Sequence, residues 1–241
     1  MASAFAFFGI DGLLQPAPVR RLLPWVLLLC ATAQAVGCGR CDRQPPPPPP
    51  PPLDAEPARA PRDAEQARFD EERRPDLIVA ALGIGPGARV ADIGAGSGLL
   101  TLHLARAVSP GGKVVATDIE NAVLDLLRSR VERAGLSSVV EPRVVAPDTP
   151  GLEPASYDVI LLAEVDHYFT DPAAWLTAAK AALKPDGAIA ITNRIHHRAS
   201  GLAAAKAAGL HLVSESSPVP STFLAVFHLQ PAGRPSKPSS P

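Results

Sequence analysis

Cysteine is scarce in this chain of 241 residues, and its distribution is uneven. The three cysteines, Cys30, Cys38 and Cys41, all precede residue 42. The rest of the chain therefore has no disulfide, no thiolate metal ligand and no cysteine nucleophile. Cys38 and Cys41 form a lone CxxC, which does not predict a zinc site without a second pair of ligands. No metal site is expected.

An excess of basic charge is also lacking. The chain has 23 Lys and Arg against 24 Asp and Glu, a net charge of −1. Because nucleic-acid-binding proteins usually present a basic face, we expect no nucleic-acid partner. A long apolar run is missing too, since the stretch Leu22–Val36 has only 15 residues. A membrane-spanning helix needs about 20.

The apolar stretch instead indicates the hydrophobic core of a signal peptide, with Arg20 and Arg21 as its basic flank. Ala35-Val36-Gly37-Cys38 resembles the lipobox of bacterial lipoproteins, although alanine stands where that family usually has leucine. The resemblance implies that Cys38 is lipidated and tethers the chain to a membrane of the bacterial envelope. An ordinary cleaved signal and an uncleaved anchor are the alternatives. Without a working signal, the chain would be cytoplasmic.

Composition divides the chain into four parts. Residues 1–38 form the signal-like segment, and we hypothesise that translation starts at Val19, which would give that signal ordinary proportions. Residues 39–61 are a linker with an unbroken proline run, Pro45–Pro52. In polyproline II this run would reach about 25 Å, so we interpret it as a stiff spacer. Residues 62–230 form the folded domain, and residues 231–241 are predicted to be disordered.

The folded domain alternates predicted strands and helices. Strands are expected at 88–93, 113–117, 139–145, 157–163, 188–192, 210–215 and 222–229. Helices are expected at 64–82 with a break at Pro75, and at 99–108, 120–134, 172–183 and 199–208. This alternation predicts an α/β fold, a doubly wound, seven-stranded, mainly parallel sheet. Only a short loop joins the last two strands, so they should form a C-terminal antiparallel hairpin.

A glycine-rich turn follows the first predicted strand. The strand ends at Asp92-Ile93 and continues into Gly94-Ala95-Gly96-Ser97-Gly98. Glycines there allow a tight turn and a close approach of a ligand to the backbone. Leu99 stands where the dinucleotide fingerprint has glycine or alanine, which disfavours a nicotinamide-dependent oxidoreductase. Asp92 precedes the turn, where a carboxylate suits a cationic ligand without phosphate.

Acidic residues also end the later predicted strands. Asp118 follows the second strand, 24 residues after Gly94, where a carboxylate can accept both hydroxyls of a ribose. Asp148 follows the third strand and Glu164 the fourth. Since the carboxyl ends of parallel strands share one edge of a sheet, these side chains are expected to lie around one site.

These motifs together resemble the class I S-adenosylmethionine-dependent methyltransferases over about residues 66–229. The stretches VADIGAGSGLLTLHLA, VVATDIE, SYDVILLAEVDHYFTDP and ALKPDGAIAI carry the likeness. The resemblance implies S-adenosylmethionine as cofactor. The residues expected to bind it are Asp92, Gly94, Ala95, Gly96, Gly98, Asp118, Ile119, Asp148 and Glu164. Of these, Asp118 would hold the ribose, and Ile119 and Asp148 the adenine.

His167 is the candidate general base for methyl transfer, with Asp166 as its orienting partner. The alternative is a loop histidine at the mouth of the site. His196 and His197, after the fifth strand, are expected to be structural or solvent-exposed. The resemblance implies a small-molecule acceptor, which the sequence does not identify.

The main alternative function is a non-catalytic binding lipoprotein that kept the fold. It would resolve a conflict, because an exported domain would lie where S-adenosylmethionine is scarce. The intact Gly94, Gly96, Gly98 and Asp118 favour the enzyme.

Overall fold

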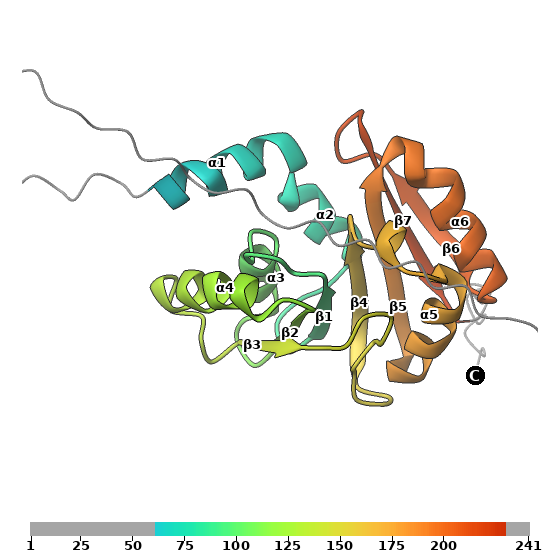
Figure 1. Cartoon of the computed structure of the whole chain (residues 1–241), viewed down its shortest axis with the longest axis horizontal. Helices are drawn as coiled ribbons and strands as arrows, with labels where there is room; N and C mark the ends of the chain where they lie inside the picture. Colours follow the sequence, from blue (N-terminus) through green and yellow to red (C-terminus); the bar gives the residue numbers. More distant parts are fainter. Residues whose placement is uncertain (1–60, 230–241) are drawn as a thin grey trace, which may run out of the picture. The chain divides into compact units, whose positions relative to one another are not determined.

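The computed structural model describes residues 61–229 (Figure 1). The predictions for the signal-like segment, the spacer and the C-terminal tail lie outside these residues. Six α-helices are described: α1 (Pro61–Arg73), α2 (Pro75–Leu82), α3 (Thr101–Val108), α4 (Asn121–Arg133), α5 (Pro172–Ala179) and α6 (Arg198–Ala207). The strands are β1 (Arg89–Ile93), β2 (Lys113–Asp118), β3 (Val140–Val144), β4 (Tyr157–Ala163), β5 (Leu183–Arg194), β6 (His211–Ser216) and β7 (Thr222–His228). Three short 3-10 turns, η1 (Asp166–Tyr168), η2 (Lys180–Ala182) and η3 (Ile195–His197), lie between them.

The strands form one seven-stranded sheet in the order β3-β2-β1-β4-β5-β7-β6. Strands β1 to β5 pair in parallel, whereas β7 pairs antiparallel with both β5 and β6. This confirms the predicted doubly wound α/β sheet with its C-terminal antiparallel hairpin. The strand order changes direction between β1 and β4, and ligands of such sheets bind outside the carboxyl ends of the strands at this point.

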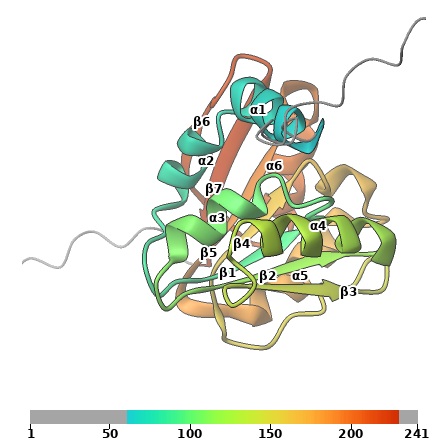
Figure 2. The ribbon, with the colours of Figure 1, turned by 90° about the vertical axis from the view of Figure 1, so that its left-hand side faces the viewer.

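Side chains alternate across each strand, so the sheet separates two apolar cores. Helices α2, α3 and α4 pack on one face, where Leu104, Leu124 and Leu127 are fully buried. Helices α5 and α6 pack on the other, where Ile160 and Ile189 are fully buried. Figure 2 shows the sheet between these helices. Because both faces are covered at the centre of the sheet, β1, β4 and β7 read as nearly continuous apolar runs, whereas the outer strand β6 is exposed along its length.

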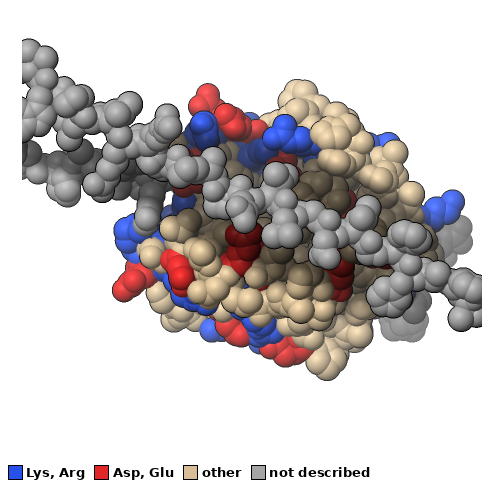
Figure 3. Space-filling model, viewed as in Figure 1, with Lys and Arg blue, Asp and Glu red and all other residues tan. Residues whose placement is uncertain are grey.

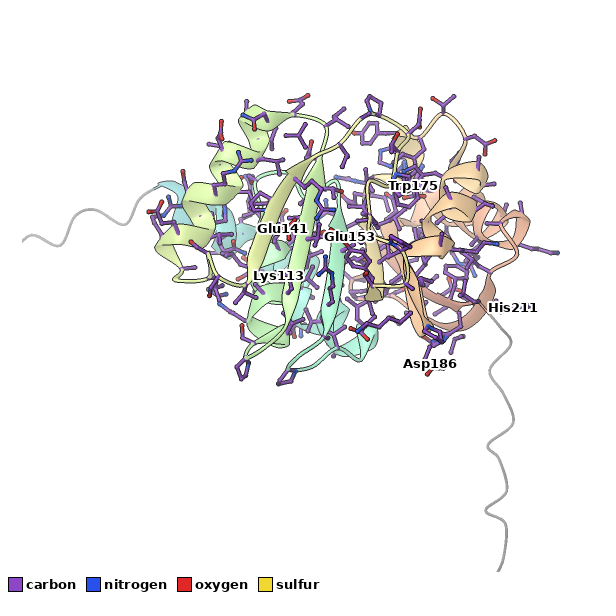
Figure 4. The ribbon with its side chains drawn as sticks, turned by 90° about the horizontal axis from the view of Figure 1, so that it is seen from below. Lys113, Glu141, Glu153, Trp175, Asp186 and His211 are labelled. Carbon is purple, nitrogen blue, oxygen red and sulfur yellow. The ribbon has the colours of Figure 1, made fainter. Side chains whose placement is uncertain are left out.

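Two local features join this frame to the site. Helix α1 ends at Arg73, and Arg74 adopts a left-handed backbone (φ 48°) before Pro75 starts α2. The predicted break at Pro75 is thereby confirmed, since a residue before proline rarely stays helical. In the apolar core beneath α5 and α6, Trp175 of α5 (Figure 4) is buried and stacks on Phe169 with ring centroids 4.6 Å apart.

Several predicted boundaries differ from those in the structure, and two of them concern turns. The helix expected from Leu99 begins at Thr101, because the glycine-rich turn extends through Leu100. The fifth strand begins at Leu183 and not at Ala188, since Leu183 already pairs with Tyr157 before a register shift. Residues 183–187 are therefore part of an irregular strand.

Charged side chains also join β3 to the segment before β4. Arg143 pairs with both Glu141 and Glu153, which lie near each other in Figure 4. None of the helices within residues 61–229 is both long enough and apolar enough to cross a lipid bilayer.

Candidate functional site

The glycine-rich turn after β1 forms the floor of the site, and its glycines have different structural roles. A Cβ on Gly98 would lie 2.7 Å from Cγ of Leu127, so this glycine lets α4 pack closely against the turn. Gly96 has φ +55°, and a Cβ built there would meet no atom within 4 Å. Packing within the protein therefore does not require a glycine at position 96, and the space beside it is open to a ligand.

Two cavities meet at this turn, and both are lined by Gly94 and Glu164. The small cavity, of about 310 Å³, lies against α1 and α2 and is lined by Phe69, Arg73, Ile78, Asp92, Ala95, Gly96, Ser97, Leu100 and neighbouring residues. The large cavity, of about 670 Å³, lies between the loops after β2, β3 and β4 and is lined by Thr117, Asp118, Ile119, Val145, Asp148, Val165, Tyr168, Phe169 and neighbouring residues.

The predicted site residues therefore converge. Asp92, Ala95 and Gly96 line the small cavity, whereas Asp118, Ile119 and Asp148 line the large one. Gly98 lines neither cavity and instead supports the turn. The face seen in Figure 3 is hollowed at its centre, and acidic side chains lie in the hollow.

Asp92 is the most perturbed carboxyl group of the site. It is 2% exposed, and its carboxylate accepts a hydrogen bond from the Thr101 hydroxyl at 2.7 Å. Burial raises its pKa to about 6, the nearby charge of Asp118 adds to the rise, and the Thr101 bond opposes it. A buried carboxylate so poorly compensated would be stabilised by a cation in the small cavity.

Asp118 is already held in place by the backbone. Its Oδ2 accepts the N–H of Gly96 at 2.9 Å, and its Oδ1 accepts the N–H of Glu120 at 3.1 Å. Each carboxylate oxygen can accept a second hydrogen bond, so a pair of ligand hydroxyls could still bind. Ile119 beside it is 56% exposed and presents an apolar surface to the large cavity.

Asp148 and Glu164 line the cavities but are engaged by the protein. Asp148 accepts hydrogen bonds from the backbone N–H and the hydroxyl of Thr170, and these bonds lower the pKa of its carboxyl. It thus joins the loop after β3 to the loop after β4. Glu164 has a left-handed backbone (φ 55°) and forms a two-pronged ion pair with Arg73 of α1.

The structure shows no direct hydrogen bond between His167 and its predicted partner Asp166, and Asn193 lies between them. Asp166 is buried, and its carboxylate accepts a hydrogen bond from Nδ2 of Asn193 at 2.7 Å. Nδ1 of His167 lies 2.9 Å from the same Asn193 nitrogen. Asn193, rather than Asp166, therefore contacts the imidazole. The ring is exposed and stacks on His197, with centroids 4.4 Å apart.

Sequence reasoning missed three further residues. Arg73 and Asn193 are the partners of predicted residues, and neither belongs to a motif. The third, Thr117, lines the large cavity, is 1% exposed, and its hydroxyl has no hydrogen-bond partner. Its place directly before Asp118 was the one available signal. Within residues 61–229, no group of three His, Cys, Asp or Glu side chains is arranged to hold a metal ion.

The chemistry of the cavities fits a cationic ligand that has no phosphate. Asp92, Asp118, Glu120, Asp148 and Glu164 line the two cavities, and Arg73 is their only basic lining residue among those described. Arg73 is paired with Glu164. A phosphate would meet carboxylates here, whereas an ammonium or sulfonium group would meet the ionised form of Asp92. The space beside Gly96 could be occupied by a ligand. The Thr117 hydroxyl, which has no hydrogen-bond partner in the protein, could bond to that ligand.

Comparison with known proteins agrees with this geometry. Residues 91–189 match the family model described as "Methyltransferase domain". This segment runs from β1 into β5 and includes the glycine-rich turn and the five acidic residues that line the two cavities.

Curated relatives match a similar part of the chain. The chain is 36% identical over 101 residues to a ubiquinone biosynthesis O-methyltransferase from Dinoroseobacter shibae, covering 42% of this chain and 39% of that protein. A protein of the same name from Xanthomonas campestris is 32% identical over 117 residues, covering 48% and 46%. The chain thus spans less than half the length of these relatives.

Solved structures resemble more of the chain. A SAM-dependent methyltransferase from Aquifex aeolicus aligns with a TM-score of 0.60 and 21% identity, covering 68% of this chain and 96% of that one. A SAM-dependent O-methyltransferase from Thermotoga maritima aligns with a TM-score of 0.55 and 21% identity, covering 67% and 66%. At these identities the likeness shows the fold alone.

Proposed function

We propose that this chain, whose residues 91–189 match the methyltransferase domain, is an S-adenosylmethionine-dependent methyltransferase with a small-molecule acceptor. One observation carries the proposal: two joined cavities at the glycine-rich turn have an acidic lining whose single arginine is paired. S-adenosylmethionine is a cationic nucleoside without phosphate, and it fits that chemistry.

The residues divide the binding between the two cavities. Asp118 would accept the ribose hydroxyls, and the large cavity, with Ile119 and Phe169 in its wall, would take the base. Asp92 and the turn at Gly96 would hold the charged amino-acid end in the small cavity. When bound, the cofactor would supply a methyl group on a sulfonium: a nucleophile would bond to the methyl carbon in line as the carbon–sulfur bond breaks, and the neutral thioether would be the leaving group.

The protein's own part in such a reaction is alignment and exclusion of water. Phe69, Ile78 and Leu100 give the small cavity an apolar wall against α1 and α2. Arg73 reaches from α1 to Glu164 after β4, so this ion pair closes one side of the site. The acceptor would approach near the carboxyl ends of β4 and β5. The names of the curated relatives make a hydroxyl oxygen the first acceptor atom to test.

Calorimetric titration of the full chain with S-adenosylmethionine and S-adenosylhomocysteine tests the proposal. We expect micromolar binding of both. Gly96→Val should weaken binding at least tenfold, because the added side chain would enter the open space at the turn. Gly135→Val is the matched control, since Gly135 has φ +68°, meets nothing within 4 Å and lines neither cavity.

Asp118→Ala should also weaken binding without unfolding the domain, which circular dichroism would check. Absence of binding by folded wild-type chain would overturn the proposal and favour the non-catalytic binding protein. Equal losses in Gly96→Val and Gly135→Val would show that backbone strain, and not occupation of the cavity, is responsible.

The N-terminal segment carries a separate proposal. We propose that Cys38 is lipidated and that the proline-rich spacer holds the domain off a membrane. The basic flank, the apolar stretch and the lipobox-like sequence support this. Intact-mass analysis of the membrane fraction, with protease accessibility of the domain, tests it. A soluble chain that retains residues 2–18 would contradict both the tether and the start at Val19.

A further inference from the structure

Asn193, the penultimate residue of β5, has an amide group whose orientation is fixed by two neighbours. Its Oδ1 accepts the backbone N–H of Arg194 at 2.7 Å. Its Nδ2 donates to Oδ1 of Asp166 at 2.7 Å. A reversed amide would place N–H against N–H and oxygen against a carboxylate. Since Asn193 is 1% and Asp166 3% exposed, no solvent relieves such a reversal.

The fixed amide determines the tautomer of His167. Nδ2 of Asn193 lies 2.9 Å from Nδ1 of His167. An amide nitrogen only donates, so Nδ1 must accept and carries no proton. In the neutral ring the proton is then on Nε2. His167 therefore presents an N–H group, and not a lone pair, on its outer nitrogen.

The position of His167 gives this tautomer a use. Its ring is exposed, and the residues near it in sequence, Val165 and Tyr168, line the large cavity. His197 stacks on the ring at an interplanar angle of 16° and limits its rotation. A ring held on one side by Asn193 and on one face by His197 offers its Nε2–H in a defined direction.

We infer that Asn193 is a positioning residue that fixes His167 as a hydrogen-bond donor beside the substrate that receives the methyl group. His167 is then not the general base. The inference rests on the proposed function only for the identity of the ligand. The group that meets Nε2 would be an acceptor of hydrogen bonds, such as a carbonyl or carboxylate oxygen. Substrates whose nucleophilic atom ionises without a protein base are then expected.

Nitrogen NMR of the full chain with ¹⁵N-labelled histidine, above the pH at which imidazoles protonate, tests the inference. His167→Gln identifies the signals of His167 among the six histidines. Wild-type protein should show a protonated Nε2 and an unprotonated Nδ1. In uniformly labelled protein, a coupling across the hydrogen bond should join Nδ1 to the Asn193 amide. Absence of this coupling, or a protonated Nδ1, would overturn the inference.

A free imidazole also favours a proton on Nε2, so the decisive variant exchanges the two buried partners. Asp166→Asn combined with Asn193→Asp keeps one amide, one carboxylate and the bond to the N–H of Arg194. The carboxylate would then face Nδ1, and His167 should move its proton from Nε2 to Nδ1. An unchanged tautomer in the folded double variant would contradict the positioning role. If the double variant does not fold, the wild-type coupling decides.

This experiment is independent of methyl transfer. The tautomer is read without cofactor or acceptor, so failure of the proposed function leaves it measurable. Binding of S-adenosylhomocysteine should be equal in wild type and double variant, because neither Asp166 nor Asn193 lines the cavities. A loss of that binding in the double variant would show a general distortion and would overturn the local role assigned to Asn193.

Discussion

Asp92→Asn should stabilise the unliganded protein while weakening its binding of S-adenosylmethionine. In the unfolded chain Asp92 titrates near 3.8, whereas burial raises its pKa in the folded protein to about 6. The folded state therefore binds this proton more tightly, so the contribution of Asp92 to stability is greatest below pH 4 and falls as pH rises towards 6. At about 1.4 kcal/mol per pH unit, the total cost of ionised Asp92 is about 3 kcal/mol.

Urea unfolding of wild type and Asp92→Asn from pH 4 to 8 measures this cost. The variant removes the charge and keeps an oxygen for the Thr101 hydroxyl. We expect it to be more stable by up to about 3 kcal/mol at pH 8 and by about half of that at pH 5. A stability difference that does not change with pH, or a variant less stable at pH 8, would refute the burial argument.

The affinity for S-adenosylmethionine should rise with pH, whereas the contribution of Asp92 to stability falls. At pH 5 about one Asp92 side chain in eleven is ionised, so affinity for a cation should fall about tenfold between pH 7 and pH 5. Calorimetry in buffers of different ionisation enthalpy should detect proton release near pH 6. Asp92→Asn should abolish both effects. Thr101→Val is the matched control, because loss of its hydroxyl should raise the pKa of Asp92 further and shift the transition to higher pH.

Three further outcomes are expected. Gly98→Ala should destabilise the domain by about 1–3 kcal/mol in urea unfolding, because its Cβ would lie 2.7 Å from Leu127; unchanged stability would contradict the close packing. Thr117→Val should leave the unliganded protein as stable or about 1 kcal/mol more stable, because the buried hydroxyl has no partner; a measured loss would reveal an unseen bond. Arg73→Met should raise the dissociation rate of S-adenosylhomocysteine in stopped flow, because its ion pair with Glu164 joins α1 to the far side of the small cavity; an unchanged rate would show that this contact does not retain the ligand.

The sequence was sufficient for the fold because short-range signals agree with the global arrangement. Apolar runs bounded by glycine and proline predicted the strands, and Pro75 predicted the break between α1 and α2. The acidic positions followed from topology, since parallel strands bring their carboxyl ends to one edge. The sequence alone was therefore enough to predict that Asp92 and Asp118 lie near one another.

The partners of those residues could not be predicted in the same way. Arg73 meets Glu164 across 91 positions of sequence, and other arginines in and beside α1 were equally plausible partners for Glu164. Asn193 replaced Asp166 as the contact of His167 because side-chain directions at a strand end depend on packing, not on spacing. Asp148 lines the predicted cavity, yet its bonds to Thr170 were invisible in the sequence.

The position of β7 between β5 and β6 has a consequence for synthesis on the ribosome. From Ala188 to Arg194, the outer edge of β5 pairs with β7. Strand β6 pairs with β7 and with no other strand among the described residues. Until residues 222–228 emerge, a nascent chain exposes the open edge of an otherwise complete parallel sheet. Among the described strands, the last to be translated is thus the one that fills the position between β5 and β6. A chaperone that recognises unpaired strand edges would find its target in this interval and lose it when translation passes β7.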